Sequence, residues 1–267
     1  MIKNIRDILS TMRLVYQPIV DNKEVVKKVE VLLRWDTSIH PTIINPEMLV
    51  AWAEEDPQAI KLVDKSVLNA LVACYSNWKF KSDTNGMEKI KFSINLSPHS
   101  IAYDESFVRK FEDVAEIIPP ELLEIELLET RFTSAMEDKL HSNLRLLSQM
   151  GISVALDDFG NGFGCINKMS WMAFDNVKLD GKLTKKINTC KEADFMIGSL
   201  IKLARDIGAD ITAEKIESRE QFLKLCEMGC KYFQGYYISR PLSNVQLIEF
   251  IKQNKKCSYS ENQMSVL

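Results

Sequence analysis

The chain has 267 residues, of which 46% are hydrophobic, and its formal net charge is −3. This length and apolar fraction allow one large core and are typical of a single α/β barrel. A binder of duplex nucleic acid is not expected, because no basic surplus is available to neutralise phosphates. A membrane protein is not expected either, since no run approaches the roughly 20 apolar residues of a span.

Cysteine usage gives a second exclusion. The six cysteines form no C-x-x-C pair, and only three histidines accompany them, so a zinc site is not expected. The segment Met1 to Arg13 mixes charges with isolated apolar residues and does not form a signal peptide. Scattered cysteines without such a signal fit a reducing compartment, and we expect a cytoplasmic protein.

Predicted strands and helices alternate from the start of the chain. Short apolar runs bounded by polar turns predict the strands, and apolar residues spaced on one stripe predict the helices. In the first half these are, in chain order, strands at 14–20 and 29–35, helices at 46–55 and 60–78, and strands at 90–96 and 122–128.

The second half repeats the alternation, and glycines at 151, 208 and 229 end three of its helices. Its predicted elements are helix 135–150, strands 152–156 and 176–179, helix 193–207, strand 210–213, helix 219–228, strand 232–238 and helix 244–252. This order favours a mostly parallel sheet closed as a (β/α)₈ barrel. We expect one domain, 1–252, followed by a polar, mobile tail, 253–267.

Polar residues follow the predicted strands where each strand ends. The most informative end is the apolar run 152–156, which stops at Asp157 and Asp158 before Gly160. Adjacent carboxylates repel each other, and they usually lie together because a cation holds them. Since active sites of barrels lie at the C-terminal ends of the strands, the ends form one set. In order, they carry Glu30, Asn95, Glu126, Asp157 with Asp158, Lys178, Glu214 and Gln234.

This set consists of oxygen donors, amides and one lysine. Oxygen ligands without thiolate or imidazole favour Mg²⁺ or Mn²⁺ over zinc. The paired aspartates could bridge two ions roughly 3.5–4 Å apart, a spacing suited to phosphodiester hydrolysis. Lys178 would position the attacking water and offset charge on the phosphorus centre.

Each feature alone has a simpler structural explanation. An acid after a strand is often the N-cap of the next helix, and Glu30 with Arg34 could form an ordinary ion pair. Asn95 could shape a turn, and the acids around Glu126 could form a solvated face. The functional interpretation rests on the whole set, because all its members fall at or near strand ends.

The chain resembles the EAL-domain cyclic di-GMP phosphodiesterases over nearly its whole length. The matching motifs are dispersed and occur in the family's order: Tyr16–Val20, Glu30–Trp35, Ser93–Ser97, Glu126–Thr130, Asp157–Gly160, Lys178–Asp180, Ala213–Glu217 and Gln234–Tyr236. The resemblance implies a modified barrel with a helix ahead of an antiparallel first strand. It also implies hydrolysis of cyclic di-GMP to linear pGpG with two divalent ions, Mg²⁺ or Mn²⁺.

The resemblance also implies a role for each matching residue. Ligands of one ion would be Glu30, Asn95, Glu126 and Asp157, and the other ion would lie near Asp157, Asp158 and Glu214. Lys178 would be the catalytic lysine, with Glu214, Glu217 and Gln234 in the metal and water network. Gln17, Leu33, Arg34 and Asp180 would hold the substrate, and Glu129 would brace the loop after the paired aspartates.

Several positions depart from the family pattern. Lys215 replaces the usual glycine, Val31 and Leu128 replace an alanine and a common threonine, and the loop Gly160–Cys165 diverges most. We therefore expect activity that is weak or conditional. The alternatives are a regulator that binds cyclic di-GMP or a protein partner without cleaving it, and an enzyme for another phosphoester. From the family we also expect a homodimer, and a sensor or regulator protein could be a further partner.

Overall fold

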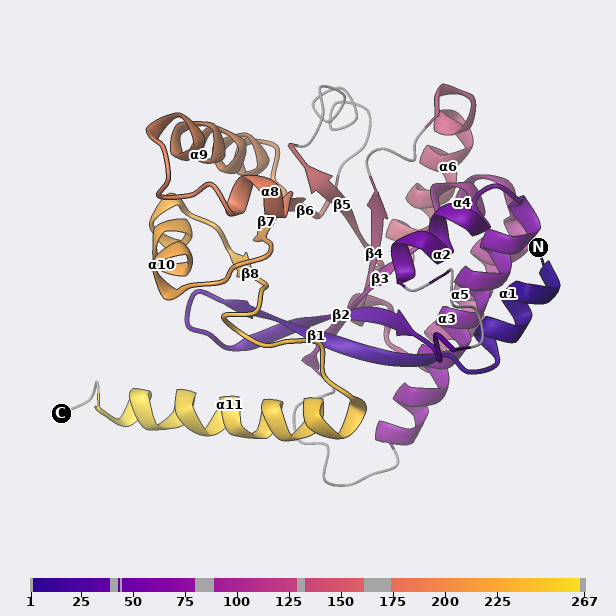
Figure 1. Ribbon diagram of the computed structural model, residues 1–267, viewed down its shortest axis with the longest axis horizontal. Helices are drawn as coiled ribbons and strands as arrows, with labels where there is room; N and C mark the ends of the chain where they lie inside the picture. The colour runs from indigo at the N-terminus through magenta and orange to yellow at the C-terminus, as the bar shows by residue number, and fades with distance from the viewer. Residues whose placement is uncertain are drawn as a thin grey trace.

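The computed structural model describes residues 2–38, 43, 45–79, 89–128, 133–160 and 174–264 (Figure 1). Eight strands of these residues close a barrel in chain order. The strands are β1 (Arg13–Asp21), β2 (Val26–Arg34), β3 (Lys91–Asn95), β4 (Leu123–Leu128), β5 (Ser153–Phe159), β6 (Asn176–Leu179), β7 (Asp210–Ala213) and β8 (Tyr232–Phe233).

The first strand runs against both of its neighbours. β1 pairs antiparallel with β2 and with β8, whereas the pairs from β2 through β8 are all parallel. The predicted α/β barrel with an antiparallel first strand is therefore confirmed. Since β2 to β8 are parallel, their C-terminal ends meet at one rim, where the polar residues of the predicted site converge.

Helices surround the barrel (Figure 1). None of the described helices combines the length and the apolar character needed to cross a bilayer. They are α1 (Ile2–Leu9), α2 (Pro46–Ala53), α3 (Pro57–Lys79), α4 (Pro98–Tyr103), α5 (Glu105–Ala115), α6 (Glu137–Gln149), α8 (Gly181–Thr184), α9 (Lys191–Asp206), α10 (Arg219–Met228) and α11 (Asn244–Met264). Short 3₁₀ turns occupy Pro120–Leu122 and Ser134–Met136.

Among the expected elements, two near the C-terminus differ most from their bounds in the structure. The strand expected at 232–238 ends at Phe233, because Gly235 follows and the Ile238 backbone N–H donates to its carbonyl in a turn, at 3.0 Å. The end of the last helix expected at Lys252 is wrong: α11 continues to Met264, and no proline or glycine interrupts residues 253–264.

Helices α4 and α5 were not expected from the residue pattern. Each begins with a side-chain cap: Ser97 accepts a hydrogen bond from the backbone of His99, and Asp104 accepts one from Phe107 at 3.1 Å. Capping residues of this kind satisfy N–H groups that the first helical turn leaves unpaired. In α5 the buried residues then recur at helical spacing, as Phe107, Val108, Phe111 and Val114.

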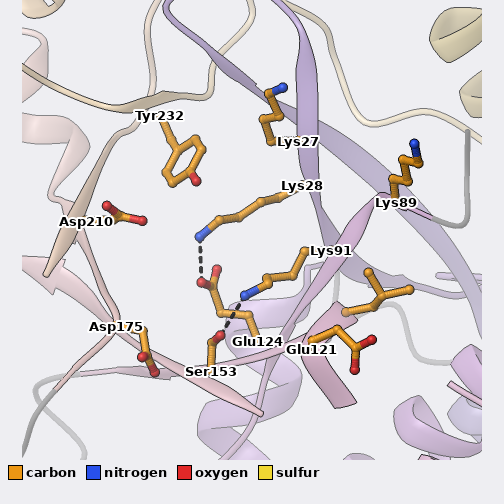
Figure 2. A pocket seen from close by; sticks show the side chains of 11 residues that line it. Lys27, Lys28, Lys89, Lys91, Glu121, Glu124, Ser153, Asp175, Asp210 and Tyr232 are labelled. Carbon is orange, nitrogen blue, oxygen red and sulfur yellow. Dashed lines mark hydrogen bonds and ion pairs between the residues drawn. The ribbon is translucent and has the colours of Figure 1, made fainter. Parts of the chain in front are cut away.

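Alternation along the strands separates an apolar exterior from a polar interior. Val29, Ile94 and Ile125 are 0% exposed among the helices, and the residues beside them point into the barrel. At the N-terminal ends of the parallel strands, the Lys28 ammonium lies 2.5 Å from Glu124 Oε2 inside this interior (Figure 2). The barrel axis is thus filled by hydrogen-bonded polar groups, as buried polar atoms require.

Candidate active site

Lys178 of β6 lies at the centre of the rim where the parallel strands end. Its ammonium nitrogen is 2.6 Å from Glu126 Oε2, 2.8 Å from Glu214 Oε1, 3.5 Å from Asp157 Oδ1 and 3.8 Å from Glu30 Oε1. The side chain is 1% exposed. A buried ammonium requires such partners, because burial without them strongly disfavours its charge.

Amide side chains orient Glu30 from two sides. Asn95 Nδ2 donates to Glu30 Oε1 at 2.8 Å, and Gln234 Nε2 donates to Glu30 Oε2 at 2.6 Å. Gln17 of β1 lies beside Gln234, at 3.3 Å, and is itself anchored to the Ser239 carbonyl at 3.1 Å. The antiparallel first strand thereby contributes to the same rim as the parallel strands.

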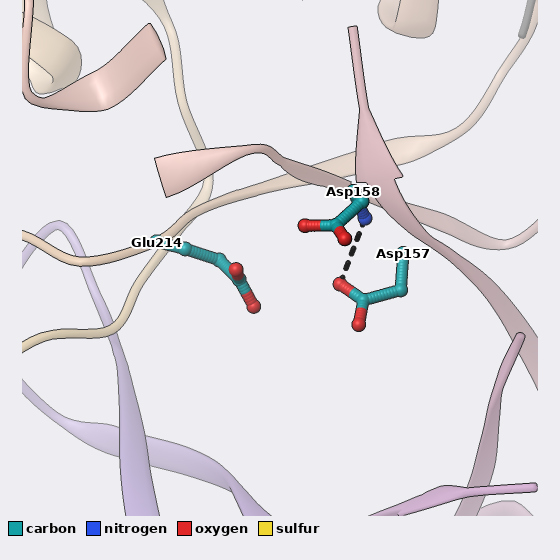
Figure 3. Close-up of side chains that lie close together, drawn as sticks. All are labelled: Asp157, Asp158 and Glu214. Atoms are coloured by element: carbon teal, nitrogen blue, oxygen red, sulfur yellow. Dashed lines mark hydrogen bonds between the residues drawn. The ribbon is translucent and has the colours of Figure 1, made fainter. Parts of the chain in front are cut away.

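A second acidic group is drawn in Figure 3, and two of its members, Asp157 and Glu214, also lie near Lys178. Asp157, Asp158 and Glu214 each offer an oxygen within 4.8 Å of the others. Consecutive residues of a strand normally point to opposite faces. Asp158 breaks this alternation because its backbone is left-handed, with φ = +57°, and its N–H donates to Asp157 Oδ1 at 3.0 Å. Both carboxylates can therefore face Glu214.

The pKa values follow from burial and from the surplus of carboxylates. Burial, with repulsion from Glu30 and Asp157, raises the pKa of Glu126 well above its usual range despite Lys178. Burial also raises the pKa of Glu214 to about 8. Burial opposes ionisation of Glu30 as well, but Lys178 and the two amides outweigh it and lower its pKa. One lysine does not neutralise this cluster.

This donor set fits divalent cations with oxygen ligands. Among the described residues, the acidic group is built from carboxylate oxygens alone, without imidazole or thiolate. Such sets suit Mg²⁺ or Mn²⁺ better than zinc. The raised pKa values agree with this, because an added cation would relieve the repulsion among the carboxylates.

The predicted substrate residues lie around the same rim. Arg34, at the end of β2, donates to the Leu33 carbonyl at 2.7 Å, and its charge helps to lower the pKa of Glu30. Asp180 is buried and caps α8, accepting from the Lys182 backbone at 2.9 Å. Leu33 is 8% exposed. Arg34, Leu33 and Asp180 thus lie where strands β2 and β6 end, at the rim that carries the proposed metal ligands.

One predicted catalytic residue lies apart from the cluster. Glu217 is exposed on the rim, where Oε1 pairs with Lys185 Nζ at 2.8 Å and both side chains are 53% exposed. Glu129 and the divergent positions Asn161 to Cys165 lie outside the described residues. The structure therefore brings together Glu30, Asn95, Glu126, Asp157, Asp158, Lys178, Glu214, Gln234 and Gln17, but not Glu217.

Lys215 occupies a strained position next to Glu214. Its φ is +53°, the left-handed region that a glycine adopts without cost. The departure noted in the sequence therefore adds a side chain where the backbone favours none. That side chain packs over Gly181, where an added Cβ would lie 2.1 Å from Lys215 Cδ. Burial and the charges of Asp157 and Asp180 raise the pKa of Asp158, and Lys215 acts in the opposite direction.

Sequence reasoning missed two buried residues behind the site. The Ser93 hydroxyl is within hydrogen-bonding distance of Glu126 Oε1 and of Glu124 Oε1, the latter at 2.9 Å. A hydroxyl carries one hydrogen, so one contact requires a proton on a carboxyl, in agreement with the raised pKa of Glu126. The available signal was alternation, since Ser93 and Glu124 each stand two residues before a predicted ligand.

Comparison with known proteins agrees with this geometry. The family model described as "EAL domain" matches residues 4–241. The chain therefore belongs to the EAL domain family. It is 28% identical over 246 residues to the probable cyclic di-GMP phosphodiesterase PdeN of Escherichia coli, covering 89% of this chain and 45% of that protein.

A second relative and two solved structures extend the comparison. The cyclic di-GMP phosphodiesterase RocR of Pseudomonas aeruginosa is 33% identical over 133 residues, covering 50% of this chain and 34% of RocR. This chain thus spans less than half the length of PdeN and of RocR. The PaMucR phosphodiesterase in complex with c-di-GMP matches with a TM-score of 0.78 and 25% identity, covering 92% of this chain and 98% of that one. A manganese and cy-diGMP complex of Klebsiella pneumoniae BlrP1 matches with a TM-score of 0.73 and 26% identity, covering 88% and 57%.

Proposed function

We propose that this protein is a metal-dependent phosphodiesterase that hydrolyses cyclic di-GMP to linear pGpG. The observation that carries the proposal is the position of Lys178 among four carboxylates, beside the group Asp157, Asp158 and Glu214. Family membership and relatives named as cyclic di-GMP phosphodiesterases support the substrate. We include two Mg²⁺ or Mn²⁺ ions in the proposal, supported by the oxygen-only donor set.

The proposed ligands are the residues that the sequence assigned. Glu30, Asn95, Glu126 and Asp157 would hold one ion, and Asp157, Asp158 and Glu214 the other. When bound, the ions would lower the pKa of a water molecule and neutralise phosphate charge. Glu30 is already ionised for this task because its pKa is lowered, whereas Glu214 must first release a proton.

The remaining residues would act on the water and on the substrate. Lys178 holds its ammonium rigidly through Glu126 and Glu214, so it can orient a water molecule and offset charge on the phosphorus centre. Gln234 and Asn95 keep Glu30 in one orientation. Arg34, at the edge of the same cluster, is suited to a phosphate oxygen.

The test is an incubation of purified protein with cyclic di-GMP and either Mg²⁺ or Mn²⁺, followed by chromatography of the nucleotides. We expect linear pGpG to form with metal and not with a chelator. A parallel panel with cyclic di-AMP and a simple aryl phosphodiester separates a dinucleotide enzyme from one acting on another phosphoester. Intact cyclic di-GMP at every metal concentration would overturn the proposal.

A second candidate function is a receptor that binds cyclic di-GMP without cleaving it. The observation that favours it is Lys215, whose strained backbone and positive side chain lie beside the second proposed metal site. The receptor predicts measurable nucleotide binding with no product. If product formation appears in Lys215→Gly but not in the natural chain, the receptor reading holds and Lys215 is its cause.

A further inference from the structure

A continuous chain of buried polar groups runs from the catalytic rim to the opposite end of the barrel. Lys178 Nζ lies 2.6 Å from Glu126 Oε2, and the Ser93 hydroxyl contacts Glu126 Oε1. The same hydroxyl lies 2.9 Å from Glu124 Oε1, and Glu124 Oε2 lies 2.5 Å from Lys28 Nζ. Every link is therefore a hydrogen bond or an ion pair between side chains.

The three residues of this polar series that lie beyond Glu126 are deeply buried. Ser93 is 0%, Glu124 is 1% and Lys28 is 5% exposed. The far end opens on a polar pocket at the N-terminal ends of the strands, where the Lys28 ammonium also lies 4.6 Å from the centre of the Tyr232 ring (Figure 2). Since buried charges hold one geometry to keep their partners, Lys28 and Glu124 form a rigid anchor.

The anchor acts on the oxygen of Glu126 that Lys178 does not contact. Lys178 binds Oε2 and Ser93 binds Oε1, so the two contacts together fix the rotation of the carboxylate. Ser93 pairs across the sheet with Glu124, and Asn95 pairs with Glu126 in the same register. Asn95 and Glu126, two proposed metal ligands, therefore lie side by side at the rim. Ser93 and Glu124 lie side by side two residues earlier in the same strands, one layer deeper in the barrel.

We propose that Ser93, Glu124 and Lys28 are positioning residues, and that this brace orients Glu126 and, through it, the Lys178 ammonium. For its effect on metal binding the inference rests on the proposed function. Partners that hydrogen-bond a metal ligand orient it, and losing one typically costs about 10- to 100-fold in metal affinity or activity.

A buried polar pair inside the same barrel provides the matched control. Thr212 Oγ1 donates to Asn176 Oδ1 at 3.1 Å, and both residues are at most 1% exposed. Thr212→Val removes a buried hydroxyl of the barrel interior without removing a contact to Glu126. Any loss of stability common to Thr212→Val and Ser93→Ala therefore reflects packing and not positioning.

The test compares Ser93→Ala, Ser93→Thr, Glu124→Gln and Thr212→Val in the full chain. One readout needs no metal: the ¹⁵N resonance of the Lys178 ammonium, assigned by its loss in Lys178→Met. The other is Mn²⁺ affinity by calorimetry. We expect Ser93→Ala and Glu124→Gln to move the Lys178 resonance and Ser93→Ala to weaken Mn²⁺ binding by about 10-fold or more, with recovery in Ser93→Thr.

The two readouts separate this inference from the proposed function. If the natural chain binds no Mn²⁺ but Ser93→Ala moves the Lys178 resonance, the phosphodiesterase proposal fails and the brace stands. If Ser93→Ala matches Thr212→Val in both readouts, the brace is overturned whatever the activity. Should Ser93→Ala fail to fold, Glu124→Gln, which keeps the size of the side chain, decides by the same criteria.

Discussion

Both ends of the barrel carry lysines and acidic residues, but the ratio of lysines to carboxylates differs between them. At the end opposite the site, two lysines each pair with one acid, Lys28 with Glu124 at 2.5 Å and Lys231 with Asp210 at 2.8 Å. At the rim of the candidate site one ammonium serves four carboxylates. Paired charges satisfy each other, whereas a surplus of one sign leaves a place for ions of the other sign.

Removing a rim carboxylate should have the largest effect. We expect Glu30→Ala or Asp157→Asn to reduce metal-dependent cleavage by more than about 100-fold while the protein stays folded, because each removes a proposed ligand. Asp210→Asn at the opposite end is the matched control and should leave cleavage unchanged. Turnover assays with circular dichroism check this, and unchanged turnover in a rim variant would remove that residue from the site.

Removing the Lys178 ammonium from the rim should destabilise the metal-free protein. Lys178→Met leaves buried carboxylates without their shared partner, and we expect the free energy of unfolding to fall by about 3–5 kcal/mol. Denaturant unfolding in a chelator measures this. Added Mn²⁺ should restore much of the loss by replacing the missing charge, and equal unfolding with and without the ion would contradict the cation-binding role of the rim.

The rim should also give the metal-free protein a distinctive pH dependence. The pKa of Glu214 is raised from 4.5 to about 8 by folding, so between these values the folded state binds more protons than the unfolded state. Its contribution to the free energy of unfolding therefore decreases as pH rises from about 4.5 to about 8. Thermal melts in a chelator should show this decline, and Glu214→Gln should flatten it.

The same protonation should make metal affinity depend on pH. Because Glu214 must be deprotonated to bind the ion, its titration alone should raise Mn²⁺ affinity by up to about 10-fold per pH unit below pH 8. Calorimetry in buffers of different ionisation enthalpy should detect protons released on binding. A proton release of zero at pH 7 would show that Glu214 is already ionised in the folded protein.

The smallest effect is expected at Lys215. Lys215→Gly removes a left-handed backbone strain at some cost in chain entropy, so we expect stabilisation of about 0.5–1 kcal/mol. Cleavage should rise or stay unchanged. Glu24→Gly is the control, since Glu24 has φ = +56° in a turn between β1 and β2. A large loss of cleavage in Lys215→Gly alone would identify the lysine as a specialised part of the site.

The parallel part of the barrel and most of the rim could be predicted from the sequence because both follow from alternation and strand order, whereas the antiparallel first strand was implied only by the family resemblance. Parallel strands end at one rim, so Glu126 and Lys178 had to be neighbours once the barrel was inferred. The left-handed backbone of Asp158 could not be read in this way, because few residues other than glycine adopt it and tertiary contacts decide where. The pairing of Glu217 with Lys185 likewise depends on where two loops meet.

Errors in the elements have equally local causes. The last strand was expected to be longer because residues 232–238 are rich in aromatic residues, but Gly235 lies against the Ile216 backbone, where an added Cβ would be 2.1 Å from a carbonyl oxygen. That contact turns the chain after Phe233. Helix α11 was expected to be shorter because residues after Lys252 are polar, although polarity does not stop a helix that lacks glycine and proline.

Closure of the barrel between its first and last strands sets the order in which the barrel can be completed during synthesis. β1 can pair with β2 as soon as both leave the ribosome, but its other edge pairs with β8, and the Tyr16 backbone bonds Leu242 at 2.8 Å in both directions. Gln17 likewise meets Gln234 only then. Until that late segment emerges, the nascent chain exposes an unpaired strand edge, the kind of surface that chaperones shield and that otherwise recruits neighbouring chains.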